Sequence, residues 1–425
     1  MVKSGIVLIG LCALMVTAQA SGVGSFVESV QAALQKHPRT LAAAAQLRAA
    51  REKHQQSRAL LLPGVELSAT RTRHQLEWPG NSAGSDPLSL NLSLTQAVFN
   101  RKALIGLAQS RPYIAAWEFD LQWTIQGVFL ETASVLVELL QAMEVRRLAS
   151  NNRDLLRHHL EETRARFKVG QLTGTDVSQG ESRLALAEAN LVRAANSVAV
   201  GRSRFREMTG EAASEGLALP GLREGVLTGT LEQLLARGAS RPDLEAARLR
   251  VQVAGGEVEM KRAAHWPTVA LTARAGRGWG EEIGGTTDPV DRYEVGVGVS
   301  LPVFSGGMTV SETAEALARK EGLDAELERL QRLMEREVES AFLELQSVQA
   351  AEASLQSALR AAEAALKGVE QEFKVGTRTS LDLLDARNDL FSARTELAKS
   401  GFAMVLARFR LLSSLGELTT EALHH

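Results

Sequence analysis

The stretch FKVGTRTSLDLLDA, Phe373 to Ala386, repeats the opening of an earlier stretch, FKVGQLTGTDVSQG, Phe167 to Gly180. Other landmarks recur in the same order at a nearly constant separation of about 205 residues, and a fixed period of this kind indicates a duplicated unit. The other recurring pairs are Pro38 with Pro242, Pro63 with Pro267, and Phe99 with Phe304. The sequence therefore predicts a tandem duplication, with one copy of the turn in each half.

Both copies of the turn carry the signals of a helix end followed at once by a helix start. Gly170 and Gly376 suit the left-handed backbone conformation that caps the C-terminus of a helix. The T-x-x-D spacing of an N-terminal capping box follows in each copy, as Thr173 to Asp176 and as Thr379 to Asp382. Each turn is therefore predicted to be the tip of a helical hairpin.

Short runs with period two lie upstream of each tip. LSLNLSLTQAVF, residues 88–99, places Leu88, Leu90, Leu92 and Leu94 on one face and Ser89, Asn91 and Ser93 on the other. YEVGVGVSL, residues 293–301, alternates in the same way, and this pattern is typical of strands with one apolar face. The partner run of each hairpin begins at residue 65 or 268. Stretches rich in Gly, Pro and polar residues, at 77–87 and 279–289, are expected to be the connecting loops. The chain is predicted to hold two β-hairpins, hence four strands.

A very long helix is predicted after each hairpin. From Leu327 to Phe373, apolar residues follow the alternating three-and-four spacing of a coiled-coil seam, and no proline follows Met308. A helix from about residue 307 to 373 would be on the order of 100 Å long. The matching helix from residue 102 to 167 contains Pro112, which we expect either to kink it or to mark its true start. Such helices must pack against each other and against other copies.

The N-terminus has the layout of a secretory signal peptide at residues 1–20. Lys3 precedes the apolar run GIVLIGLCALMV, and the small-residue sequence AQA precedes Ser21. A transmembrane anchor is the alternative, but it needs a longer apolar run. The only cysteine, Cys12, follows Leu11 where a lipoprotein signal has a small residue, so we expect no lipid attachment. The mature chain then has no thiol.

Four strands cannot close a barrel alone, and an open sheet edge is not tolerated in lipid. Two copies would supply eight strands and three copies twelve, with the Ser and Asn faces toward a lumen and the Leu and Val faces toward lipid. The net charge of −2 excludes a nucleic-acid binder by bulk charge. A secreted coiled-coil scaffold without a pore is the alternative, and the equal placement of the two hairpins favours the pore.

The whole mature chain resembles the outer-membrane efflux protein family, also called the TolC family. The resemblance rests on the proline-led helix, the hairpin, the LPVFSGG start of the second long helix and the V-G-x-x-T-x-x-D tip, and it is strongest in VGTRTSLDLLDARNDLFSARTELA. It implies a mainly α fold in which a homotrimer forms a 12-stranded outer-membrane β-barrel above a periplasmic tunnel of coiled-coil helices. It also implies a periplasmic adaptor protein and an inner-membrane transporter of the RND or ABC type as partners in efflux or type I secretion.

The resemblance assigns roles to residues at the tips. Asp382 and Asp385 are expected to form stacked carboxylate rings at the pore constriction, which would favour cations and raise the carboxylate pKa values. The alternative for Asp382 is that it only caps its helix. Arg378 is expected to link closed tips through Asp176 of a neighbouring tip, or else to be an exposed turn residue. Phe373 stands where the family has a tyrosine, so a hydroxyl link is absent there.

Four turn residues, Val169, Gly170, Val375 and Gly376, are expected to form the adaptor-docking surface, although plain turn chemistry also explains the glycines. No metal-ligand spacing connects the histidines, and helical histidines such as His158 and His159 are usually surface residues. The glycines of RAGRGWGEEIGG precede no helix, so a nucleotide site is excluded. We expect no enzyme activity and no cofactor, and heavy-metal cargo is an alternative without a Met, Cys or His cluster to support it.

The repeat divides the mature chain. The first repeat is expected at residues 21–210 and the second at residues 241–416. Between them, residues 211–240 are predicted to form an irregular equatorial segment, and residues 417–425 form a C-terminal tail.

Overall fold

A computed structural model describes residues 25–214, 216–219, 221–222, 228–280, 289–419 and 423–424. The predicted signal peptide and Cys12 lie outside these residues. The long elements fall into two matching series, each a helix, a pair of strands, a very long helix and a shorter helix. The helices of the first half are α1 (Phe26–Lys36), α2 (Pro38–Ala59), α3 (Arg101–Lys168) and α4 (Gly174–Thr209). Those of the second half are α5 (Leu231–Gly238), α6 (Pro242–Arg262), α7 (Met308–Lys374) and α8 (Ser380–Leu415), with a 3-10 turn at Ala263–His265.

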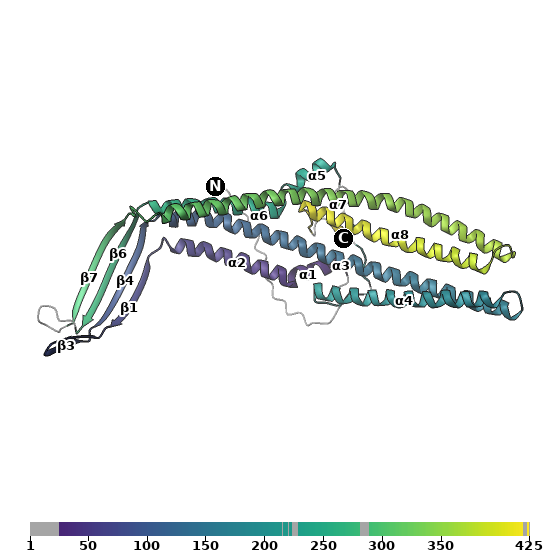
Figure 1. Ribbon diagram of the computed structural model, residues 1–425, viewed down its shortest axis with the longest axis horizontal. Helices are drawn as coiled ribbons and strands as arrows, with labels where there is room; N and C mark the ends of the chain where they lie inside the picture. The colour runs from purple at the N-terminus through teal and green to yellow at the C-terminus, as the bar shows by residue number, and fades with distance from the viewer. Residues whose placement is uncertain are drawn as a thin grey trace.

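The molecule is a long rod with the strands at one end and the two helical turns at the other (Figure 1). The α3–α4 and α7–α8 turns lie at the same end although they are far apart in sequence. α3 and α7, with 68 and 67 residues, run along most of the rod, and each is on the order of 100 Å long. The duplication therefore places two similar turns side by side at one end of the chain.

The four predicted strands form one antiparallel sheet in the order β1–β4–β6–β7. They are β1 (Gly64–Arg71), β4 (Leu88–Phe99), β6 (Thr268–Trp279) and β7 (Val290–Ser300). In the register, Leu92 lies opposite Leu67 and Ala275, and Ala275 lies opposite Tyr293. Since residues that face each other across antiparallel strands share a face, the predicted Leu and Val faces form one continuous apolar surface.

The first hairpin loop is more regular than predicted. Within residues 77–87 and just before them, β2 (His74–Trp78) and β3 (Asn81–Ser85) pair as a small antiparallel hairpin. Gly80 adopts a φ of +81° at its turn, a conformation that glycine adopts without steric cost. The sequence predicted only a connecting loop here, and the additional strands were missed because the loop contains its own two-residue turn, Pro79–Gly80, between the paired residues Trp78 and Asn81.

Pro112 does not mark the start of the first long helix. α3 begins at Arg101, where the Asn100 side chain accepts a hydrogen bond from the backbone N–H of Ala103, and Pro112 lies inside the helix. The side-chain cap satisfies a backbone donor that the helix leaves free at its N-terminus, so the helix starts before the proline. In α7, Met334, Val338, Ala341 and Leu345 are buried, as the coiled-coil spacing predicts.

The middle of the rod contains the largest core. One cluster joins Phe26 and Phe129 to Phe409, and a second joins Met334 and Val338 to Leu411. Part of the predicted irregular segment contributes a helix here, since Thr230 and Gln233 form a capping box at the start of α5. The short strands β5 (Gly221–Leu222) and β8 (Leu423–His424) pair, so the segment also contacts the C-terminal tail.

Arg241 is buried in this middle region with 1% of its surface exposed. Its guanidinium lies 2.7 Å from an Asp243 carboxylate oxygen and 2.6 Å from one of Glu337, over the Trp123 ring. An unpaired charge would be costly in this position, so the two carboxylates offset its desolvation. The residue anchors the start of α6 to α3 and α7.

In the described part of the chain, no helix is both long enough and apolar enough to span a membrane.

Candidate functional site

The two tips have the same hydrogen-bond pattern. At the first, Gly170 donates to the Phe167 carbonyl at 2.9 Å and Gln171 donates to the Arg166 carbonyl at 3.0 Å. At the second, Gly376 donates to Phe373 at 3.1 Å and Thr377 donates to Glu372 at 3.0 Å. This pair of bonds, with φ of +78° at Gly170 and +82° at Gly376, is the Schellman motif, and it confirms the predicted left-handed caps.

Capping boxes follow both glycines, as predicted. The Thr173 hydroxyl accepts from the Asp176 N–H, and the Asp176 carboxylate accepts from the Thr173 N–H at 2.8 Å. Thr379 and Asp382 repeat this arrangement, with the carboxylate 2.9 Å from the Thr379 nitrogen. The repeated turn is thus a complete link between two antiparallel helices, made from local contacts alone.

Asp382 acts as a helix cap in the single chain. Hydrogen bonds from the backbone N–H and then from the hydroxyl of Thr379 lower the pKa of the Asp382 carboxyl, and Arg378 adds a smaller effect in the same direction. This is the opposite of the raised pKa expected for a ring of carboxylates, because the single chain supplies donors and a cation but no second carboxylate. The capping interpretation therefore describes Asp382 within one chain.

Asp385 pairs with a residue that sequence reasoning missed. Its Oδ1 atom lies 2.6 Å from a guanidinium nitrogen of Arg183 on α4, which belongs to the other half of the chain. Both side chains remain partly exposed to solvent. Nothing in the sequence near Arg183 signals this contact, because it depends on how the two helical hairpins face each other.

Arg378 pairs within its own tip. Its Nε atom lies 2.8 Å from Glu372, and an outer guanidinium nitrogen lies 3.8 Å from Asp382. Asp176, the partner expected from a neighbouring tip, bonds to Thr173 in this chain. The predicted link between Arg378 and Asp176 stays a prediction about contact between copies, and the intrachain contact with Glu372 was not predicted.

Phe373 joins the second tip to the first long helix. Its ring lies under the Arg166 guanidinium, 5.3 Å from the ring centroid, and 6.5 Å from the ring of His159. A cation over an aromatic face is a weak attractive contact, so Phe373 makes an inter-hairpin contact without the hydroxyl of a tyrosine. His158 is exposed as expected, but the surface prediction for His159 was wrong, since only 4% of His159 is exposed.

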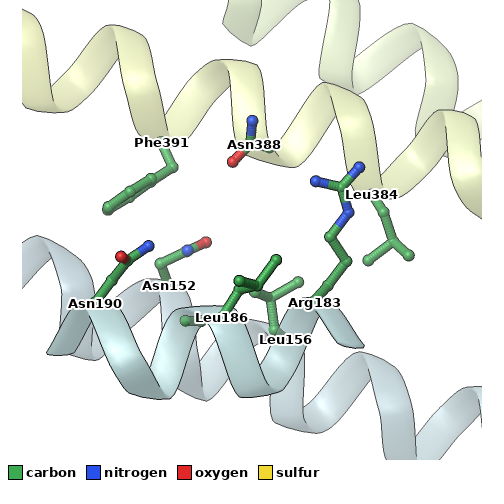
Figure 2. Close-up of a pocket in the computed structure, with 9 residues that line it drawn as sticks. Asn152, Leu156, Arg183, Leu186, Asn190, Leu384, Asn388 and Phe391 are labelled. Atoms are coloured by element: carbon green, nitrogen blue, oxygen red, sulfur yellow. The ribbon is translucent and has the colours of Figure 1, made fainter. Parts of the chain in front are cut away.

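A cavity of about 140 Å³ lies on the seam between the two hairpins, between α4, α3 and α8 (Figure 2). Its apolar wall includes Leu156 and Leu384, which form a small buried cluster with Ala187. Its polar lining consists of Asn152, Arg183, Asn190 and Asn388. A seam with a void makes fewer packing contacts than a close-packed core.

The outermost turn residues differ in exposure and role. Val169 and Val375 are 70% and 75% exposed, so each tip presents an apolar side chain to its surroundings. Gly170 and Gly376 are fixed by backbone conformation, which explains them without a partner. The docking role of all four stays a prediction.

No group of three or more His, Cys, Asp or Glu side chains among the described residues has the arrangement of a metal site. Residues 274–279 of the glycine-containing stretch RAGRGWGEEIGG lie in strand β6. The stretch from 281 onward lies outside the described residues.

The comparisons with known proteins agree with the architecture of the rod. The sequence model of the family described as outer membrane efflux protein matches residues 29–211 and 232–417. This chain belongs to the outer membrane efflux protein family. The two matched segments correspond to the two halves of the duplication, and the family consists of outer-membrane channel proteins and not of enzymes.

Individual relatives span nearly the whole chain. The outer membrane protein TolC of Escherichia coli is 27% identical over 431 residues, which covers 98% of this chain and 87% of TolC. The alkaline protease secretion protein AprF of Pseudomonas aeruginosa is 27% identical over 436 residues, covering 97% of this chain and 88% of AprF. The solved structure of the outer-membrane channel OprN has the same fold, with a TM-score of 0.79 at 23% identity over 92% of this chain and 89% of OprN.

Proposed function

We propose that three copies of this chain form an exit duct that crosses the outer membrane as a 12-stranded barrel and continues through the periplasm as a helical tunnel. One observation carries the proposal. Among the described residues, a four-stranded sheet whose edge strands β1 and β7 have no outer neighbour lies at one end of a rod, and the other end of the rod carries two hairpin tips. An unpaired edge is not tolerated in lipid, so other copies must supply the neighbouring strands. Twelve strands leave a lumen, whereas the interior of an eight-stranded barrel is filled by side chains.

The two faces of the sheet suit lipid and water. One face of the sheet carries apolar side chains that are exposed in the single chain. The strand register places on this face Val65, Leu67, Tyr293, Val295 and Val297. Exposed apolar side chains on one continuous face fit contact with the hydrocarbon of the outer membrane. The opposite face carries Ser89, Asn91 and Ser93, which fit a water-filled lumen.

The tips are proposed to be the gate of the duct. Asp382 and Asp385 of three copies would place carboxylates around the constriction, and Arg378, Asp176 and Phe373 would hold the closed tips together. The exposed side chains of Val169 and Val375, with Gly170 and Gly376, would receive a periplasmic adaptor. The adaptor in turn would connect the duct to an inner-membrane transporter of the RND or ABC type.

The duct serves either efflux or type I secretion in this proposal. The relative TolC is an outer membrane protein, and AprF is a secretion protein for alkaline protease. Both relatives align along nearly the whole chain, so a passive duct shared by both roles is the common function.

Reconstitution in planar lipid bilayers tests the proposal. Protein extracted from the outer membrane with detergent is expected to have the mass of three chains and to give stepwise, cation-selective conductance. A folded protein that stays in one or two copies and never conducts would instead support the pore-free scaffold.

A further inference from the structure

His159 occupies an unusual position on the seam between the two hairpins. It lies on α3, is 4% exposed, and its Nε2 atom is 3.5 Å from the Ser380 hydroxyl at the start of α8. Its ring also lies beside Phe373 near the end of α7. The Nδ1 atom is buried and finds no hydrogen-bond partner among the described residues. A buried polar atom without a partner is costly, so the closed seam holds this imidazole at an energetic cost.

The charged groups that act on the imidazole come from α3 and α8. The positive charge of Arg387 on α8 disfavours protonation of the imidazole, and Arg387 pairs with Glu370 of α7 at 3.5 Å. The positive charge of Arg166 on α3 has the same effect, and Arg166 pairs with Glu162 at 2.6 Å. At this end of the rod α4 contributes Glu181, paired with Arg164, and Arg183, paired with Asp385. Glu162, the carboxylate that acts on His159, is therefore already paired with an arginine.

These surroundings disfavour the protonated ring. Burial lowers the pKa of His159, the positive charges of Arg387 and Arg166 lower it further, and Glu162 opposes them. A protonated imidazole would add a third positive charge beside those of Arg387 and Arg166. The closed seam therefore favours the neutral form of His159.

We propose that His159 is a pH-sensitive latch, which allows the α3–α4 and α7–α8 hairpins of one chain to stay in contact when neutral and separates them when protonated. The inference rests on the proposed gate at the tips, and it adds a regulatory signal to that gate. Mild acidification of the periplasm would open the seam at His159 and Ser380 and so widen the tip.

The direction of the pH effect follows from how strongly the closed and the open tip bind a proton at His159. Once the hairpins separate, His159 reaches water and regains an ordinary pKa near 6.5. Above about pH 7 both states are neutral and pH has no effect, whereas below about 6.5 the open state takes up a proton that the closed state excludes. The ratio of open to closed tips then rises by up to about tenfold per pH unit for each exposed His159.

Bilayer recordings of the assembled protein at pH 7.5 and pH 5 test the latch. Wild type is expected to show a several-fold rise in open probability at pH 5, and His159→Gln, which is neutral at both values, is expected to show none. His158→Gln is the matched control, because His158 is the exposed neighbour on the same helix, and it should respond as wild type does. A His159→Gln variant that keeps the wild-type pH response would overturn the proposal.

A distance measurement separates failure of the latch from failure of the duct. Spin labels at Val169→Cys and Val375→Cys report the distance between the two tips of one chain, when labelled chains are diluted with unlabelled ones. This distance is expected to lengthen at pH 5 in the otherwise wild-type chain and to stay constant with His159→Gln. Constant distance in both chains would overturn the latch even if the duct conducts, and a pH-dependent distance without any conductance would leave the latch intact and remove the duct.

Discussion

Thr379 and Asp382 fix the start of α8 through two reciprocal hydrogen bonds, and Thr173 and Asp176 do the same for α4. Thr379→Ala removes the hydroxyl that receives the Asp382 N–H, and loss of such a cap weakens the helix start about fivefold in its local opening equilibrium. Hydrogen exchange of the Asp382 and Leu383 amides should accelerate by this factor. Thr173→Ala should do the same at the first tip, and a change confined to one tip would contradict the equivalence of the two turns.

The hydrogen bonds between Thr379 and Asp382 predict that the stability of the tip depends on pH in the acid range. Because the folded tip lowers the pKa of Asp382, its stabilising effect is complete above the ordinary aspartate pKa of about 4 and is lost as the pH falls through the lowered value. Wild type and Asp382→Asn, which lacks the carboxylate charge, should therefore differ in exchange at pH 6 and converge in strong acid, after correction for the intrinsic exchange rate. A constant difference at all pH values would show that the carboxylate is not involved.

Substitutions of Asp385 and Arg183 distinguish a role of this pair in the pore from a purely structural role. If the carboxylate lines the constriction, Asp385→Asn should lower the preference for cations over anions by at least about twofold, because it removes negative charge from the pore. Arg183→Gln should raise this preference, since it frees the same carboxylate from its cation. Reversal potentials in asymmetric salt measure both. If the pair only joins α4 to α8, both variants will loosen the tip and neither will shift selectivity.

The helical hairpins depend on glycine at a single backbone position in each turn. Gly376→Ala forces a side chain into a φ of +82°, which costs about 1 kcal/mol and makes local opening about fivefold more frequent. Trypsin cleavage after Lys374 or Arg378 should accelerate by that factor. Gly368→Ala is the control, because this glycine is helical, with open space around it, and alanine there favours the helix. Equal cleavage of the two variants would contradict the role of the turn.

Patterns within short stretches of sequence predicted most helices and strands, but they could not predict the contacts between them. The alternation of apolar and polar residues predicted the four strands, and the three-and-four spacing of apolar residues predicted α7. Each pattern arises because one face of the element is apolar. The β2–β3 hairpin was missed because its short polar run carries no such pattern. α5 was missed although Leu231, Leu234 and Leu235 have helical spacing and a capping box precedes them. The contacts of Arg183 and His159 across the seam follow from the relative rotation of two hairpins, about which no single helix carries a signal.

At the scale of the whole molecule, the duplication explains why the rod ends in two tips. One sheet is assembled from both halves, so the two long helices leave it in the same direction and their turns reach the same end (Figure 1). Contacts across the seam, from Phe373 to Arg166 and from Asp385 to Arg183, then join the halves within one chain. Links between copies at Arg378 and Asp176 would close the ring.

The most direct test of the central claim, that the repeated turns gate an outer-membrane duct, is single-channel conductance of Arg378→Ala beside Glu372→Gln and wild type. Arg378→Ala is expected to raise the small wild-type conductance several-fold. Glu372→Gln, which breaks only the intrachain pair, is expected to leave the conductance close to wild type. Equal conductance in all three proteins, at any level, would contradict a gate at the tips.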